Sequence, residues 1–189
     1  MGVSTSDSIV IVGAGAFGLS VALHLSLRGY TNVSVFTKDD YIPFGDLTNV
    51  YRAAQDAGVR FFLGQHVDQI SYVSTLAGKK NAGIRTRNAG FYPSSLVIID
   101  AGAGDTGTSE IGQLHAPDSL AIPLSCYTNT NPNSFVEYVP HTSSSVILLS
   151  GNLVQKSKIS LVGPLVVDLL EATSGQQTAV IPPQPLSRL

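Results

Sequence analysis

The glycine-rich turn near the N-terminus constrains the fold more than any other feature of the chain. Residues 9–12 read Ile-Val-Ile-Val, and such a β-branched run is typical of a strand buried on both faces of a parallel sheet. Gly13, Gly15 and Gly18 follow this run directly, at the spacing G-x-G-x-x-G. Leucines then repeat every four residues, which predicts a helix over residues 16–28. The start of the chain therefore predicts a strand, a tight turn and a helix.

A second apolar segment completes this first unit. Arg28 is a basic residue in the predicted last turn of the helix, and Gly29 is a glycine just past its end. Residues 33–36 form another short apolar run. The strand–helix–strand segment has the length that a right-handed βαβ crossover requires. We therefore predict an α/β fold with a central parallel sheet.

The rest of the chain continues the alternation of strands and helices. Residues 49–57 predict a helix with Val50, Ala53, Ala54 and Ala57 on one face. A further helix is predicted with Pro164 in its first turn, and residues 106–141 predict mainly loops. The remaining predicted elements are strands at 59–63, 67–73, 84–92, 96–99 and 146–149, a turn at 78–81 and the helix itself at 161–170.

Composition narrows the classes of protein to which the chain can belong. The 189 residues are 43% hydrophobic and 13% charged, which is too apolar for a disordered chain and fits one domain with a core of its own. A net charge of −2 with scattered basic residues excludes a nucleic-acid footprint. Apolar runs fall short of the roughly 20 residues that span a bilayer, so no membrane contact is predicted. The single cysteine, Cys126, has no partner for an internal disulfide.

Each glycine of the turn has a physical role in binding a dinucleotide. Gly13 permits the tight turn, Gly15 lets the backbone approach a pyrophosphate, and Gly18 lets helix and strand pack closely. The phosphates would then meet the N–H groups of Ala16 and Phe17 at the positive end of the helix. These five residues are the predicted phosphate site, and the alternative is a tight turn of an α/β fold that binds no nucleotide.

The ribose end of such a site departs from the usual pattern. An acidic residue commonly follows the second strand and takes the ribose hydroxyls. Here Thr37 and Lys38 follow the strand, and the first acids, Asp39 and Asp40, come two or three residues later. Asp39 and Asp40 are either displaced ribose ligands or ordinary solvated loop charges.

Residues 8–20, together with the later Arg28-Gly29-Tyr30, resemble the start of the D-amino-acid-oxidase superfamily. Within it, the resemblance is to the fructosyl amino acid oxidase, sarcosine oxidase and pipecolate or saccharopine oxidase group. It implies a Rossmann-like domain with FAD as cofactor. Val67 is similar to the valine whose backbone meets the adenine, and residues 96–103 resemble the strand and turn beside the flavin. The cofactor-binding residues that the resemblance adds are Val67, Ala101, Gly102, Gly151 and Lys158.

Two departures concern covalent flavin and the closing loop. The position of the cysteine that can bond to flavin is Ser125 here, whereas Cys126 stands one residue late, and a one-residue slip reverses the face of a strand. The resemblance therefore implies noncovalent flavin, with Cys126 a small buried residue. Lys158 keeps its spacing, but the glycines of the family's closing loop are replaced.

Two segments of the family are missing, near residues 44–48 and 108–119, where the resemblance places a flavin-contacting loop and the substrate-binding sheet. We therefore predict an FAD-binding domain over residues 1–173 with the substrate domain largely missing, followed by a flexible tail over 174–189. Catalytic residues are not assigned, because the four histidines lack partners at catalytic spacing: His24, His66, His115 and His141. His24 is predicted to be a surface or packing residue.

The resemblance implies an FAD-dependent oxidoreductase that oxidises a C–N bond of an amino acid or secondary amine, a small-molecule substrate, with oxygen as acceptor. Two alternatives stay open: a non-catalytic nucleotide-binding remnant, or pseudoenzyme, and an incomplete product of a longer oxidase gene. An NAD-dependent enzyme fits least, since nothing downstream resembles a dehydrogenase substrate domain.

The last three residues, Ser187, Arg188 and Leu189, form a conservative variant of the Ser-Lys-Leu peroxisomal address. They predict the peroxisomal import receptor as a partner and a peroxisomal location, with a frayed tail on a cytoplasmic protein as the alternative.

Overall fold

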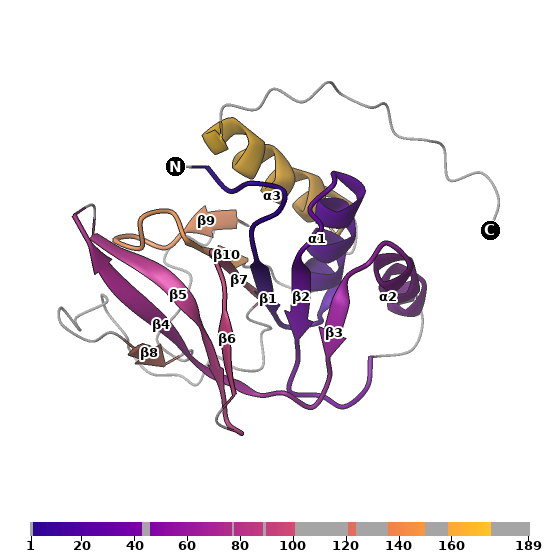
Figure 1. The fold of residues 1–189 in the computed structure, drawn as a ribbon. Coiled ribbons are helices and arrows are strands. Elements are labelled where there is room, and N and C mark those ends of the chain that lie inside the picture. The colour runs from indigo at the N-terminus through magenta and orange to yellow at the C-terminus, as the bar shows by residue number, and fades with distance from the viewer. Residues whose placement is uncertain are drawn as a thin grey trace.

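A six-stranded, mainly parallel sheet forms the centre of the computed structural model (Figure 1). The structure describes residues 2–42, 46–76, 78–88, 90–100, 121–123, 136–149 and 159–174. The strand order is β3-β2-β1-β7-β10-β9, in which β9 alone runs antiparallel to its neighbour. These strands are β1 (Ile9–Val12), β2 (Val33–Phe36), β3 (Arg60–Phe62), β7 (Leu96–Asp100), β9 (Val136–Tyr138) and β10 (Val146–Leu149). The prediction of an α/β fold with a central parallel sheet is confirmed.

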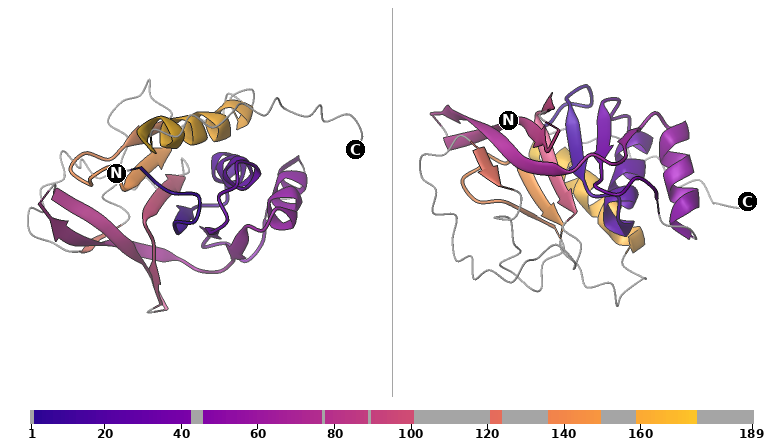
Figure 2. Two further views of the ribbon diagram at one scale, coloured as in Figure 1. Left: turned by 45° about the horizontal axis from the view of Figure 1, so that its top comes forward. Right: turned by 90° about the horizontal axis from the view of Figure 1, so that it is seen from below.

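Three helices and a second sheet cover the two faces of the central sheet (Figures 1 and 2). The helices are α1 (Ala16–Leu27), α2 (Asp46–Asp56) and α3 (Ile159–Ser174). The antiparallel second sheet, of order β6-β5-β4-β8, consists of β4 (Val67–Thr75), β5 (Gly78–Thr86), β6 (Phe91–Pro93) and β8 (Ala121–Pro123). Over the described residues no further sheet is present, so the predicted lack of a substrate domain holds for this part of the chain.

Alternation along the central strands divides the core into two layers. Ile9 and Ile11 of β1 pack with the helices, whereas Val10 and Val12 pack with β4 and β5 of the second sheet. The same alternation holds along β7 and β10. All four residues of β1 are buried because both faces of the sheet are covered, which is why the sequence reads as a continuous apolar run.

The course of the chain through the sheet places a crevice next to β1. The chain enters at β1, moves outward through β2 and β3, and then returns to the other side of β1 as β7 and β10. In open α/β sheets, ligands bind outside the carboxyl ends of the strands at the point where the strand order reverses. That point lies between β1 and β7, and the glycine turn stands at it.

Several predicted boundaries are wrong for physical reasons. The buried side of α2 contains Leu47, Val50, Tyr51 and Ala54, and the helix begins at residue 46 rather than 49. The alanines predicted to share that side, Ala53 and Ala57, are exposed. Alanine is small enough to be tolerated on the buried or the exposed face of a helix, so its position did not identify the buried face of α2.

The predicted turn at 78–81 is in fact strand, since β5 begins at Gly78. Asn81 is a buried residue that joins three segments. Its side-chain amide donates to the Ser94 carbonyl at 2.9 Å, and its backbone N–H donates to Ser145 Oγ at 2.8 Å. Asparagine is common in turns, but here its amide satisfies buried polar groups instead. Strands β8 and β9 also lie in the stretch predicted to be mainly loop.

Helix α3 packs along α1, and their contact explains two sequence features. A Cβ at Gly163 would lie 2.7 Å from the Ser20 carbonyl oxygen and against the His24 ring, so a glycine is required there. His24 is thus a packing residue, as predicted. Because α3 begins at Ile159, Pro164 lies inside the helix and not in its first turn, which corrects the prediction.

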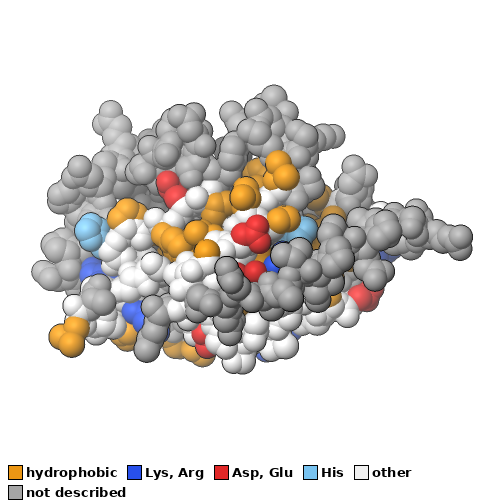
Figure 3. Space-filling view, turned by 90° about the horizontal axis from the view of Figure 1, so that it is seen from above, with side chains coloured by type: hydrophobic (Ala, Val, Ile, Leu, Met, Phe, Trp, Pro, Cys, Tyr) orange, Lys and Arg blue, Asp and Glu red, His pale blue; other side chains and the backbone are white. Residues whose placement is uncertain are grey.

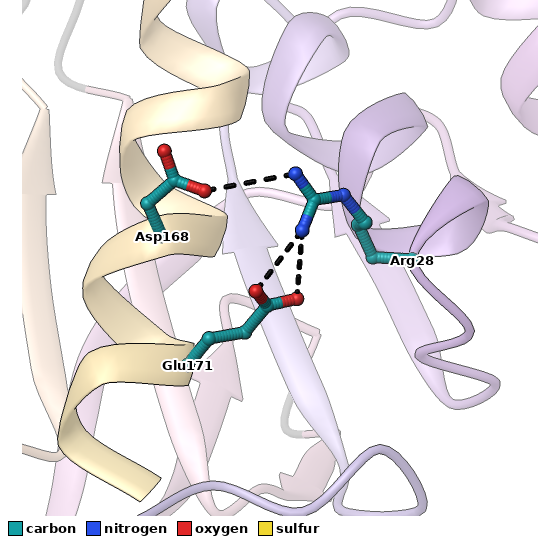
Figure 4. Close-up of polar contacts among 3 residues, drawn as sticks. All are labelled: Arg28, Asp168 and Glu171. Atoms are coloured by element: carbon teal, nitrogen blue, oxygen red, sulfur yellow. Dashed lines mark hydrogen bonds and ion pairs between the residues drawn. The ribbon is translucent and has the colours of Figure 1, made fainter. Parts of the chain in front are cut away.

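Charged residues close the far end of this helix pair (Figure 4). Arg28 Nη1 lies 3.0 Å from both carboxylate oxygens of Glu171, and Nη2 lies 3.6 Å from Asp168 Oδ1. Seen from above, the molecule shows hydrophobic side chains at its surface (Figure 3). Exposed large hydrophobic residues include Leu27 of α1 and Leu161 and Leu165 of α3. Among the described helices, none has the length and apolar character to cross a membrane.

Candidate dinucleotide-binding site

The first glycine of the turn is required by backbone conformation and by the neighbouring strand. Gly13 has a φ of +108°, a region that side chains other than glycine rarely adopt. A Cβ there would also lie 2.6 Å from the carbonyl oxygen of Asp100, at the end of β7. Its N–H donates to the Phe36 carbonyl at 2.8 Å, which joins the turn to the end of β2.

The other two glycines allow α1 to start directly against the turn. A Cβ at Gly18 would press on the Gly13 carbonyl oxygen, and one at Gly15 would lie 2.7 Å from Asp100 Oδ2. Gly15 is also the N-cap of α1, with φ −71° and ψ −177°, and provides no side-chain cap. These contacts agree with the predicted roles of Gly13 in the tight turn and of Gly18 in close packing, whereas the predicted approach of a pyrophosphate to Gly15 remains a prediction.

Asp100 supplies the cap that the helix sequence lacks, and the sequence reasoning missed it. Asp100 Oδ2 accepts a hydrogen bond of 2.9 Å from the Gly18 N–H, and the backbone of Gly15 also bonds to this carboxylate. Burial raises the pKa of Asp100 above its usual range, and the two backbone hydrogen bonds oppose that shift. One sequence signal could have identified Asp100. It is an acidic residue at the end of the strand 96–99, and the resemblance places a flavin contact directly after this strand.

Two N–H groups of the first helical turn remain open to a ligand. The described residues provide no hydrogen-bond acceptor for the backbone N–H of Ala16 or Phe17. Gly15 is exposed and both following residues are partly exposed, so the turn reaches the surface. Unsatisfied N–H groups at the positive end of a helix are a suitable site for a phosphate. The structure therefore brings together the five predicted phosphate-contacting residues.

The carboxyl end of β2 contains a buried threonine where an acid is usual. Thr37 is 7% exposed, and its carbonyl accepts a hydrogen bond of 2.8 Å from the Gln65 N–H. Asp39 and Asp40 both have exposed side chains in the following loop. Their position favours solvated loop charges over ribose ligands.

Val67 lies beside this end of the site, at the start of β4. It is 4% exposed and belongs to the core cluster that includes Val12 and Phe36. The bond between Gln65 and Thr37 draws the segment before Val67 alongside the end of β2. Its predicted contact with adenine remains a prediction.

Several predicted residues lie outside the described part of the chain. These are Ala101, Gly102, Gly151 and Lys158, together with Ser125, Cys126, His115 and the C-terminal Ser187, Arg188 and Leu189. Of the other histidines, His66 Nε2 lies 3.4 Å from Asp68 Oδ1, and His141 is exposed. Within the described residues, no group of three or more His, Cys, Asp or Glu side chains is placed to hold a metal.

A hollow of about 480 Å³ lies along strands β1, β2 and β3, with residues of β5 and β6 also lining it. Ser8, Asn32 and Arg60, which line it, stand at or just before the first residues of β1, β2 and β3. Phe36, Phe62 and Tyr92 form its aromatic part. Phe36 and Phe62 are the last residues of β2 and β3, so the hollow extends along these strands from their amino ends to their carboxyl ends.

Comparison with known proteins agrees with the geometry of the turn. Residues 8–46 match the FAD dependent oxidoreductase (DAO) family. No curated protein matches the sequence.

Among solved structures, the chain is similar to two enzymes of Aspergillus fumigatus. For fructosyl amine:oxygen oxidoreductase (amadoriase I) the identity is 16% and the TM-score 0.42, over 54% of this chain and 50% of that chain. For fructosamine oxidase (amadoriase II) the identity is 18% and the TM-score 0.42, over 52% of this chain and 47% of that chain. THI4 of Thermovibrio ammonificans matches with 15% identity and a TM-score of 0.44, over 50% and 56%.

The matched region thus spans about half the length of the amadoriases. The family match covers β1, the glycine turn, α1 and β2, which are the elements that build the candidate site. Over residues 8–46, the N-terminal βαβ unit of this chain is thus similar to the FAD dependent oxidoreductase (DAO) family.

Proposed function

We propose that this chain binds FAD through the glycine turn and is the cofactor-binding part of an oxidoreductase that oxidises a C–N bond of an amino acid or secondary amine, with oxygen as acceptor. The observation that carries the proposal is the pair of open N–H groups at the start of α1, located where the strand order reverses. The family match over the same residues supports FAD as the dinucleotide.

The described residues fit the diphosphate part of FAD. The N–H groups of Ala16 and Phe17 would bind it at the positive end of α1. Val67 and Thr37 would flank the adenosine end. Bound flavin supplies hydride acceptance from a C–H beside nitrogen, whereas the protein supplies position and electrostatics.

A second candidate is a nucleotide-binding protein without catalysis. Its support is that the described residues beside the glycine turn include one ionisable side chain, Asp100, which is already engaged with the backbone. An incomplete product of a longer oxidase gene would look the same over these residues. Sequencing transcripts across residues 44–48 and 108–119 separates these two cases, because an incomplete product predicts additional coding sequence at those junctions.

We also propose that Ser187, Arg188 and Leu189 direct the chain to peroxisomes through the import receptor. A fluorescent protein fused to the N-terminus should co-localise with a peroxisomal marker. Deletion of the last three residues should disperse it, and a diffuse signal for the full chain would contradict the proposal.

The first test of FAD binding is the absorption spectrum of the purified chain after incubation with FAD and gel filtration. The expected result is a flavin spectrum in the protein fraction that acid precipitation releases into the supernatant, since Ser125 implies noncovalent cofactor. Colour kept in the pellet would instead show a covalent link. Soluble protein that stays colourless at all FAD concentrations would overturn the proposal.

Turnover provides the test of the reaction. Flavin-loaded protein should produce peroxide in air with a panel of fructosyl amino acids, sarcosine and pipecolate, if the oxidase proposal holds. Flavin binding with no peroxide and no bleaching of the flavin by any of these amines would support the non-catalytic alternative.

A further inference from the structure

All three glycines of the turn pack on one acidic side chain. Asp100 Oδ2 lies 2.7 Å from the Cβ position of Gly15 and 3.0 Å from that of Gly18, while the Cβ of Asp100 lies 3.0 Å from that of Gly13. The same oxygen accepts the Gly18 N–H at 2.9 Å. Part of the space that the glycines leave open is therefore filled by a carboxylate of the chain itself.

We propose, building on the FAD site proposed above, that Asp100 is a built-in competitor for that site. Its carboxylate holds the N-terminal end of α1, so the chain binds a diphosphate tightly only when Asp100 is neutral. Asp100 thereby makes FAD binding depend on pH.

Electrostatics at the helix end supports the competition. The N-terminus of a helix offers the equivalent of roughly half a positive charge, which one anion already compensates. Two anions placed at the same helix end repel each other strongly in a partly dehydrated site. Asp100 also uses two backbone N–H groups that a diphosphate would otherwise share.

The described segments in contact with Asp100 supply no opposite charge. Among the described residues, Asp100 contacts the glycine turn and the first turn of α1, and β10 pairs Leu149 with it. Within the described residues, none of these segments contains a titratable side chain or a cation. A proton on Asp100 is therefore the available means of neutralising the carboxylate.

The direction of the titration makes this proton accessible. Burial raises the pKa of Asp100, so the neutral form persists to higher pH than for an exposed aspartate. A bound diphosphate would favour the neutral form further, because binding and protonation are linked. Lower pH should therefore strengthen FAD binding.

The test measures the Kd for FAD by fluorescence titration between about pH 4 and pH 8, a range that brackets a raised aspartate pKa. For the unchanged chain, we expect affinity to fall at least tenfold as the pH rises through this range. Asp100→Asn keeps an oxygen that accepts the Gly18 N–H and removes the charge. This variant should bind FAD as tightly at pH 8 as the unchanged chain does in acid.

Asp56→Asn is the matched control, since it removes an exposed carboxylate at the end of α2 and changes the net charge equally. It should retain the pH dependence of the unchanged chain. Equal FAD affinity of the unchanged chain and Asp100→Asn across the range would overturn the inference and leave the proposed FAD site intact. Failure of both to bind FAD at every pH would overturn the FAD site and the inference together.

Discussion

The two ends of the candidate site differ in what builds them. At the end of β1, the candidate phosphate site consists of backbone N–H groups and three glycines whose Cβ positions are blocked by neighbouring atoms. At the end of β2, recognition of a ribose would depend on a side chain, and the position after the strand contains the buried Thr37. The first end has all three glycines of the pattern, and the second lacks its usual acid.

The difference shows which parts of a cofactor site are tied to the fold itself. Replacing Gly13 or Gly18 would strain the junction of β1, α1 and β7, so the fold itself requires these residues. A ribose-binding acid touches the ligand and can be exchanged at little cost to the fold. Four experiments test this contrast, taken from the largest expected effect to the smallest.

Gly18→Ala should be the most damaging change, because its new methyl group would meet the Gly13 carbonyl oxygen. We expect a loss of about 3 kcal/mol in the free energy of unfolding, as for other overpacked core sites. Gly29→Ala is the control: Gly29 has φ +86° but nothing near its Cβ position, so it should lose only about 1 kcal/mol. Urea unfolding measures both values, and equal losses would mean that close packing at the turn is unimportant.

Ala16→Pro should weaken FAD binding without unfolding the helix. Proline suits the first helical position, and Gly15 already has the extended conformation that precedes a proline. The change removes one phosphate-binding N–H, which should raise the Kd for FAD about tenfold or more. Ala16→Ser retains the N–H and should bind normally. Unchanged affinity in Ala16→Pro, with an unchanged melting temperature, would contradict the assignment of the open N–H groups.

Thr37→Asp should improve the weaker end of the site. A carboxylate at this position would accept hydrogen bonds from the ribose hydroxyls, for an expected gain of about 1 kcal/mol, or roughly fivefold in the Kd for FAD. Thr37→Ser serves as the control for altered packing, and Asp39→Asn should have no effect, since Asp39 is exposed. If Asp39→Asn weakens binding instead, Asp39 is the ribose ligand after all.

Asp100→Asn should change the pH dependence of folding in the absence of ligand, with the smallest effect of the four. A folded-state pKa raised above the ordinary value of 3.8 means that the folded chain favours the neutral form. The stabilisation from this proton is complete below the unfolded pKa and is lost as pH rises through the folded one. As the pH increases from 3.8, the melting temperature of Asp100→Asn should therefore rise relative to that of the unchanged chain. A constant difference across the range would contradict the raised pKa.

Local patterns identified most of the central sheet. The runs at 9–12, 33–36, 96–99 and 146–149 form β1, β2, β7 and β10 almost as predicted, because strands covered on both faces need continuous apolar sequence. The predictions of a turn at Asn81 and of a buried alanine face on α2 were wrong. Asparagine occurs in turns and in strands, and alanine on either face of a helix, so distant neighbours decide the place of both. The alternation that separates Ile9 from Val10 across the sheet was visible only once both covering layers were known.

The sequence by itself determined the glycine turn, because the contacts that demand glycine there lie within one short βαβ unit and leave a fixed spacing. Only the tertiary structure showed that Asp100, more than eighty residues further along the chain, caps the helix that this turn begins. No sequence pattern in the glycine turn or around Asp100 predicts that contact, because it depends on β7 pairing with β1. Steric contacts between residues close in sequence impose a fixed spacing that can be seen in the sequence. The pairing of distant strands depends on the packing of the whole fold, and so does the charged residue that this pairing brings to a binding site.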